Sequence, residues 1–133
     1  MSYLPQRKVL MLEEEPSLRN ALLTLLAGLG CETDLAYSGK QAIDIIRNEK
    51  FDAVLLDLRC PHAEAEQVVS WIQWLQPTLL SNVLVITADV ADAKTLDLIE
   101  RYLLLQVAGN RPAQDLVSTL RVLLHLPPVL ECA

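Results

Sequence analysis

Several features that often reveal a function are scarce in this chain. Four of the 133 residues are glycine, and no glycine-rich loop of the kind that cradles phosphate groups occurs. The three cysteines, Cys31, Cys60 and Cys132, are odd in number and lack CxxC or Cys/His spacing, so we expect reduced thiols and no zinc site. No basic run stands out, which argues against nucleic-acid binding because phosphate contacts need clustered lysine and arginine.

Long apolar segments and an export signal are also missing. The longest apolar runs are well short of the ~18 residues that a membrane span needs. The positive charges near the N-terminus precede a short strand-like run and not a signal-peptide core. With 52% hydrophobic and 21% charged residues and a net charge of -6, the chain is expected to form one domain with its own core. We expect a cytoplasmic protein without a membrane segment.

Five apolar runs alternate with five segments of helical periodicity. Residues 9–12, 54–56 and 82–87 are almost continuously apolar, as in central strands that are buried on both faces. Residues 31–37 alternate, as in an edge strand, and residues 103–108 fit either a fifth strand or further helix. This order predicts an α/β fold with a doubly wound five-stranded parallel sheet, strand order 2-1-3-4-5, flavodoxin-like (βα)5, with helices on both faces. The helices are expected at 16–29, 42–48, 68–75, 91–100 and 116–124.

Polar residues follow or end the strands at the centre of this predicted sheet. Glu13 and Glu14 follow the first strand, and Asp57 ends the third. Thr87 ends the fourth strand, and Arg111 follows the fifth. These ends meet at the carboxyl edge of the sheet, where open α/β folds bind their ligands. The alternative is that Asp57 only begins a turn, in which aspartate is common.

The carboxylates at this edge predict a metal site. Converging carboxylates repel one another unless a cation lies among them, and Mg²⁺ prefers oxygen ligands. An aspartate beside such an ion can act as a nucleophile toward phosphorus. The metal, a hydroxyl and a basic side chain would then stabilise the charge on the phosphoryl oxygens.

The chain resembles the receiver domain of two-component response regulators. Residues 9–16 match the family's hydrophobic strand, acidic cluster and proline, and residues 38–42 match its turn and the start of its second helix. Residues 54–61 match the phosphoacceptor strand and the proline four residues after it. Residues 85–88 match the strand that ends on a hydroxyl, and Arg111-Pro112 stands where the family has Lys-Pro. Five fragments in register at the right spacing are together a specific signal.

The resemblance implies a role for three residues in phosphoryl transfer. Asp57 would accept a phosphoryl group from a sensor histidine kinase or a phosphotransfer protein. Thr87 would donate a hydrogen bond to that group and report phosphorylation to the surface. Arg111 would replace the lysine that pairs with the phosphate, and Ala108 stands where the family usually has an aromatic ring.

The resemblance also implies the ligands of a Mg²⁺ ion. They are the carboxylates of Glu14, Asp57 and Glu13 and the backbone carbonyl of Arg59, with Glu14 the direct ligand of the acidic pair. The family has aspartate where this chain has Glu13 and Glu14, and each extra methylene moves the carboxylate outward. Mg²⁺ tolerates little error in its octahedral geometry, so we expect weakened binding.

Two hypotheses about function follow. In the first, the domain is a phosphorylation switch of signal transduction and not an enzyme. In the alternative, it is a divergent pseudo-receiver that binds proteins without phosphorylation. The presence of Asp57, Thr87 and a positive charge at Arg111 favours the switch.

The resemblance extends over residues 8–126, and it implies a receiver domain at 1–126 followed by a tail or the start of a linker at 127–133.

The fourth helix, the fifth strand and the fifth helix carry more apolar residues than one buried stripe needs, which predicts a homodimer through this face. The structural alternative is that these residues are core and helix ends. The residues concerned are Tyr102 and the aliphatic residues Leu98, Leu104, Val122, Leu123 and Leu126.

Overall fold

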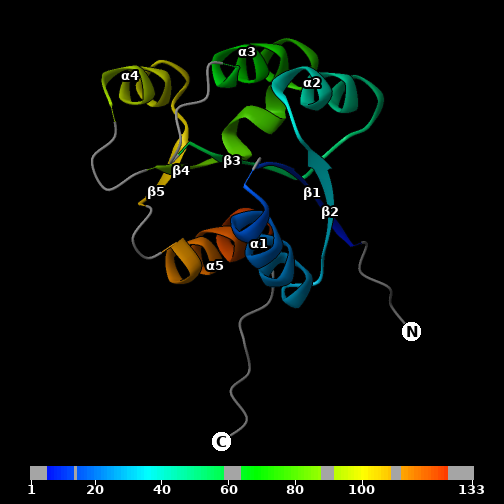
Figure 1. Cartoon of the computed structure of the whole chain (residues 1–133). Helices are drawn as coiled ribbons and strands as arrows, with labels where there is room; N and C mark the ends of the chain where they lie inside the picture. Colours follow the sequence, from blue (N-terminus) through cyan, green and yellow to red (C-terminus); the bar gives the residue numbers. More distant parts are fainter. Residues whose placement is uncertain (1–5, 14, 59–63, 88–91, 109–111, 126–133) are drawn as a thin grey trace, which may run out of the picture.

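The computed structural model describes residues 6–13, 15–58, 64–87, 92–108 and 112–125 (Figure 1). Within these ranges the chain forms a five-stranded parallel sheet with the order β2-β1-β3-β4-β5. The predicted fold class and strand order are therefore confirmed. The strands are β1 (Arg7–Leu12), β2 (Cys31–Ala36), β3 (Ala53–Asp57), β4 (Val83–Thr87) and β5 (Leu105–Ala108).

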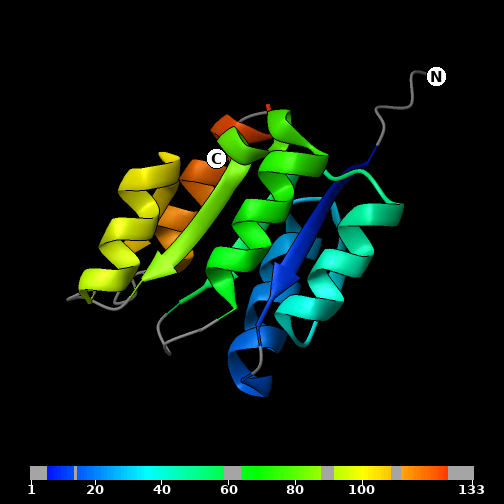
Figure 2. The ribbon, with the colours of Figure 1, turned by 90° about the horizontal axis from the view of Figure 1, so that it is seen from above.

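Helices cover both faces of the sheet. Figure 1 shows α1 and α5 on one face and α2, α3 and α4 on the other, and Figure 2 shows several of these helices running alongside the strands. None of the helices in the described ranges is long and apolar enough to cross a membrane. The helices are α1 (Pro16–Gly28), α2 (Gly39–Asn48), α3 (Ala65–Leu75), α4 (Ala93–Tyr102) and α5 (Pro112–Leu123), with a 3₁₀ helix η1 (Pro77–Asn82).

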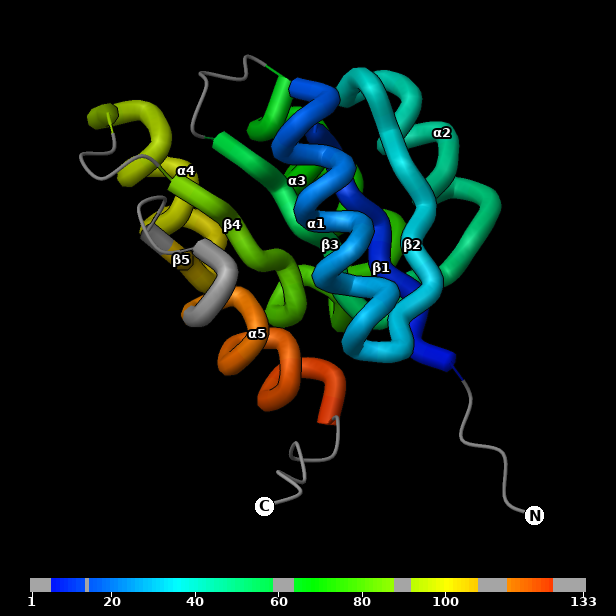
Figure 3. Tube along the Cα trace, turned by 60° about the horizontal axis from the view of Figure 1, so that its bottom comes forward, coloured from blue at the N-terminus to red at the C-terminus, as the bar shows by residue number. Residues whose placement is uncertain are grey.

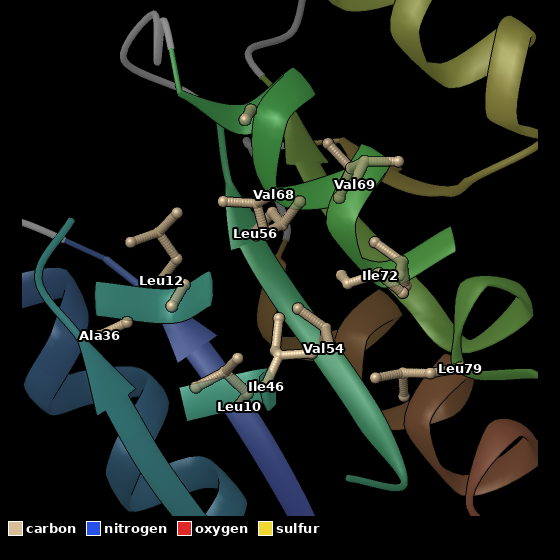
Figure 4. Packing of buried hydrophobic residues seen from close by; sticks show 14 of the residues in the cluster. Leu10, Leu12, Ala36, Ile46, Val54, Leu56, Val68, Val69, Ile72 and Leu79 are labelled. Atoms are coloured by element: carbon tan, nitrogen blue, oxygen red, sulfur yellow. The ribbon is translucent and has the colours of Figure 1, made fainter. Parts of the chain in front are cut away.

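The central strands are buried on both faces, which explains why their sequences are almost continuously apolar. On the α2–α3–α4 face, Leu10, Val54 and Leu56 of the sheet pack with Ile72 of α3 (Figure 4). The opposite face packs against α1 and α5 through a second cluster that includes the buried free thiol of Cys31. Alternate residues of β1, β3 and β4 therefore contribute to two separate clusters, one on each face of the sheet.

Local signals in the sequence explain where helices begin and end. Pro16 occupies the first helical position of α1, where its missing N–H is not needed. Gly30 has φ of 79°, the left-handed conformation that glycine adopts without strain after a helix. Ser38 accepts a hydrogen bond from the backbone N–H of Gln41 and caps α2.

The structure corrects the bounds of several predicted helices. Helices α2, α3 and α5 begin at Gly39, Ala65 and Pro112, three or four residues before their predicted starts. The fourth helix continues to Tyr102 instead of ending near residue 100, and it ends where Leu103 takes a left-handed conformation with φ of 54°. Of the two alternatives left open for residues 103–108, the strand is confirmed for residues 105–108, because pairing with β4 satisfies their backbone groups. The 3₁₀ helix η1 has no counterpart in the sequence prediction.

Candidate functional site

Three buried polar side chains lie at one edge of the sheet. Asp57 is the last residue of β3 and is 5% exposed, and Thr87 is the last residue of β4 and is 0% exposed. Glu13 directly follows β1 and is 6% exposed. Among the polar and charged side chains of the described residues, these three are the buried ones. Burial of polar groups is unfavourable unless they have partners, so their concentration at one edge marks a candidate site.

The register of the strands places these residues on neighbouring chains. Leu12 pairs with Leu56, so the next residues along β1 and β3 are Glu13 and Asp57. Asp57 pairs with Ile86, and Thr87 follows directly on β4. The three residues therefore stand at the ends of neighbouring strands at the carboxyl edge, and the meeting of their side chains stays a prediction.

The backbone after Asp57 is held by β4. The N–H of Leu58 donates to the carbonyl of Ile86 at 2.7 Å, which continues the pairing one residue beyond the strand. Leu58 is also buried and packs in the core cluster on the α2–α3–α4 face. Asp57 therefore lies between two residues that are fixed by the sheet and the core.

Glu13 hydrogen-bonds to the residue that caps α1. Its Oε1 accepts a hydrogen bond from the backbone N–H of Glu15 at 2.9 Å. Glu15 in turn accepts hydrogen bonds from the backbone N–H groups of Leu18 and Ser17 and caps α1. These bonds, with Leu18 the larger contributor, lower the pKa of the Glu15 carboxyl below its ordinary value. Glu13 and Glu15 are thus both tied by hydrogen bonds to the start of α1.

Thr87 has a partner that the sequence analysis missed. Gln106 of β5 donates from Nε2 to Thr87 Oγ1 at 2.9 Å. The register partner of Thr87 on β5 is Ala108, and Gln106 lies two residues before Ala108. The signal that could have found Gln106 is this spacing, because alternate residues of a strand point to the same face.

A second contact absent from the sequence analysis anchors the end of the β3–α3 connection. Glu64, the N-cap residue of α3, accepts a hydrogen bond at Oε2 from the backbone N–H of Gly39 at 2.7 Å. Gly39 begins α2, so the carboxylate of Glu64 lies at the positive end of that helix. This contact joins the N-termini of α2 and α3 on the side of the sheet where β3 ends.

Glu14, Arg59 and Arg111, three of the predicted site residues, lie outside the described residues. In the ranges that the structure describes, no group of three or more His, Cys, Asp or Glu side chains gathers as a metal site would. The carboxylates of Glu13 and Asp57 still fit what Mg²⁺ needs, because this ion is usually bound by one or two carboxylates and keeps several waters. Their burial at adjacent strand ends provides oxygen donors of the right type.

Comparison with known proteins assigns the family. Residues 9–108 match the response regulator receiver domain, so the chain belongs to this family of two-component signalling domains. A response regulator receiver protein of Anaeromyxobacter sp. is 31% identical over 86 residues, which are 65% of this chain and 35% of that protein. The transcriptional regulatory protein ZraR of Escherichia coli is 34% identical over 80 residues, 60% of this chain and 18% of ZraR. The chain therefore spans about a third or less of the length of these curated relatives.

Solved structures agree with the fold. A CheY-like receiver domain from Methanospirillum hungatei superimposes with a TM-score of 0.78 at 16% identity, covering 91% of this chain and 95% of that one. A second similar structure is the receiver domain of a sensor histidine kinase from Pseudomonas aeruginosa, which has a magnesium ion coordinated in its active site cleft. It superimposes with a TM-score of 0.77 at 18% identity, covering 91% of this chain and 99% of that one. The fold is therefore that of CheY-like receiver domains.

Proposed function

We propose that this domain is a phosphorylation switch in which Asp57 accepts a phosphoryl group from a sensor histidine kinase or a phosphotransfer protein. The observation that supports this most is the burial of Glu13, Asp57 and Thr87 at the carboxyl edge, on neighbouring strands. Membership of the receiver family supports the same assignment. The unit proposed to carry this function is residues 1–126, and the segment 127–133 lies outside the described residues.

The proposed transfer is a displacement at phosphorus. A carboxylate oxygen of Asp57 attacks the phosphorus of a phosphohistidine, and the O–P bond forms as the N–P bond breaks. The imidazole leaves with the electron pair of the broken bond. The hydroxyl of Thr87 donates a hydrogen bond to a phosphoryl oxygen, and the guanidinium of Arg111 supplies positive charge near it.

The residues proposed to hold Mg²⁺ are Glu13, Glu14, Asp57 and the backbone carbonyl of Arg59. When bound, the ion neutralises the charge that collects on the phosphoryl oxygens. The fit rests on the two described carboxylates, Glu13 and Asp57, which are buried at adjacent strand ends. Glutamate at both acidic positions places its carboxylate one methylene further from the backbone than aspartate, so we expect a weaker ion site than in members with aspartate.

Incubation with acetyl phosphate and Mg²⁺, followed by intact mass spectrometry, tests the switch. We expect the wild type to gain the mass of one phosphoryl group and Asp57→Asn to gain none. A second receiver domain that is known to be modified under the same conditions serves as the positive control. An unchanged mass of the wild type beside a modified control would contradict the switch and favour the phosphorylation-independent interaction module.

We also propose that the face formed by α4, β5 and α5 is a homodimer interface. Of the residues predicted for it, Leu98 and Leu104 are buried core residues, whereas Val122 is 75% exposed. Leu103 is 84% exposed and Leu105 is 37% exposed, and both lie where α4 ends and β5 begins. Figure 3 shows α4, β5 and α5 together at the end of the sheet opposite β2. Exposed aliphatic residues on adjoining elements support a protein-binding surface.

Light scattering of the eluting protein, with and without acetyl phosphate, tests the dimer. We expect the mass of two chains in at least one condition and a single chain for Val122→Glu. Trp74→Glu is the matched control, because Trp74 is 79% exposed but lies on α3, outside the proposed interface. A single chain in both conditions, or a dimer that Val122→Glu leaves intact, would contradict this interface.

A further inference from the structure

A side-chain hydrogen bond joins the buried end of β4 to an exposed residue of β5. Gln106 Nε2 donates to Thr87 Oγ1 at 2.9 Å. Thr87 is fully buried at the candidate site, whereas the side chain of Gln106 is exposed to solvent. Any change in the position of the Thr87 hydroxyl therefore acts directly on a side chain that a partner could contact.

The sheet itself brings the two side chains together. Alternate residues of a strand point to the same face, so Thr87 shares a face with Val85 and Gln106 shares a face with Leu104. Val85 and Leu104 belong to one core cluster, which also contains Leu98 of α4. Thr87 and Gln106 consequently lie on the face of the sheet that α4 covers.

The direction of this bond determines what the hydroxyl can do. A threonine hydroxyl has one proton to donate and two lone pairs that accept. Because Oγ1 of Thr87 accepts from the Gln106 amide, its own proton stays available for another acceptor. The oxygens of a phosphoryl group are acceptors, so the bond from Gln106 leaves the hydroxyl in the donor state that such a group requires.

We propose that Gln106 is a positioning residue that holds the Thr87 hydroxyl as a donor toward the phosphoryl group on Asp57 and couples phosphorylation to the exposed surface of β5. This inference rests on the proposed function of Asp57. At the position where the family usually has an aromatic ring this chain has Ala108, which is the register partner of Thr87. A hydrogen-bonded amide takes over the link between the site and the surface.

Three substitutions of Gln106 and Thr87 test the bond. Gln106→Met keeps the length of the side chain but removes the donor, and Gln106→Glu replaces the donor with an acceptor that would take the Thr87 proton. Thr87→Val removes the hydroxyl at nearly constant shape. Gln73→Met, at an exposed glutamine of α3, is the matched control for the same chemical change. Thermal unfolding of each variant shows whether it is folded.

The first readout is the rate at which acetyl phosphate and Mg²⁺ modify each protein. We expect Gln106→Met to be about fivefold slower than wild type, which corresponds to ~1 kcal/mol for one oriented hydrogen bond. Gln106→Glu should be slower still, and Gln73→Met should equal wild type. In the Thr87→Val background, Gln106→Met should cause no further decrease. A wild-type rate for Gln106→Met, or an undiminished effect in the Thr87→Val background, would overturn the proposal.

A second readout separates this inference from the function of Asp57. In the unmodified protein, the side-chain amide signals of Gln106 in a ¹H–¹⁵N spectrum should shift on Thr87→Val and not on Gln73→Met. If these signals shift but the wild type is never phosphorylated, the proposed function is contradicted while the hydrogen bond stands. If phosphorylation occurs and the Gln106 signals are the same in wild type and Thr87→Val, the positioning role is wrong.

Discussion

Replacing Gly39 with alanine places a methyl group against Glu64, the N-cap residue of α3. A Cβ at position 39 would clash with the Cβ of Glu64 and would lie 3.1 Å from its Oε2. The first contact is with an atom next to the backbone, so the side chain of Glu64 cannot simply rotate away. The start of α3 must move, and the hydrogen bond from the Gly39 N–H to Glu64 is stretched or lost.

The size of the effect follows from these contacts. Overpacking by one methyl group in a tight site is unfavourable by ~1–3 kcal/mol. A lost hydrogen bond to a carboxylate adds ~1 kcal/mol after allowance for the partial exposure of Glu64. Alanine in a helix is favoured over glycine by ~1 kcal/mol, which offsets part of the loss. We expect Gly39→Ala to lower the free energy of unfolding by about 2 kcal/mol.

Urea unfolding monitored by circular dichroism measures this change. Gly28→Ala is the control, and it should change the free energy of unfolding in the opposite direction. A Cβ at Gly28, which ends α1, would meet no atom within 4 Å. Alanine there should raise the free energy of unfolding by ~0.5–1 kcal/mol. A neutral or stabilising Gly39→Ala, similar to Gly28→Ala, would refute the argument that Glu64 fixes the junction of α2 and α3.

Three further changes probe the core, the end of α4 and its start. Leu56→Ala should lower the free energy of unfolding by ~2–5 kcal/mol, since the side chain is fully buried, and urea unfolding measures this loss. Leu103→Gly should raise the free energy of unfolding by ~1 kcal/mol, because the exposed leucine has φ of 54°, a left-handed conformation that is unfavourable for side chains with a Cβ. A lower free energy of unfolding in the same assay would contradict this. Hydrogen bonds from Thr95 lower the pKa of Asp92 below its ordinary value of 3.8, so its contribution to stability is present above that value and is lost as the pH falls through the folded-state pKa. Asp92→Asn, which keeps a capping oxygen, should flatten this acid dependence, and an unchanged pH profile of stability would exclude Asp92 as its source.

Most of the fold follows from patterns that can be read along the chain. Continuous apolar runs identify β1, β3 and β4 as central strands, and the alternation of residues 31–37 identifies β2 as an edge strand. Strand β5 could not be separated from helix, because periodicity over residues 103–108 does not distinguish the two. Its pairing with β4 is a long-range interaction that a local pattern does not contain.

At the site, too, local patterns in the sequence predict some features and long-range contacts determine the others. The positions of Asp57 and Thr87 at strand ends could be predicted, since an apolar run that stops on a polar residue marks the edge of a sheet. The partners Gln106 and Glu64 could not, because their contacts depend on side chains reaching between separate elements. The excess of aliphatic residues near α4 was only partly a surface feature, since Leu98 completes the core.

The most direct test of the account is the location of the phosphoryl group. An acyl phosphate on aspartate is reduced by borohydride to homoserine, which remains at that position through proteolysis and peptide mass spectrometry. After treatment with acetyl phosphate and Mg²⁺, we expect this conversion at residue 57 alone and at no position in Asp57→Asn. Conversion at another carboxylate, or none in a wild type treated beside a modified control receiver, would contradict the assignment of Asp57 as the phosphoacceptor.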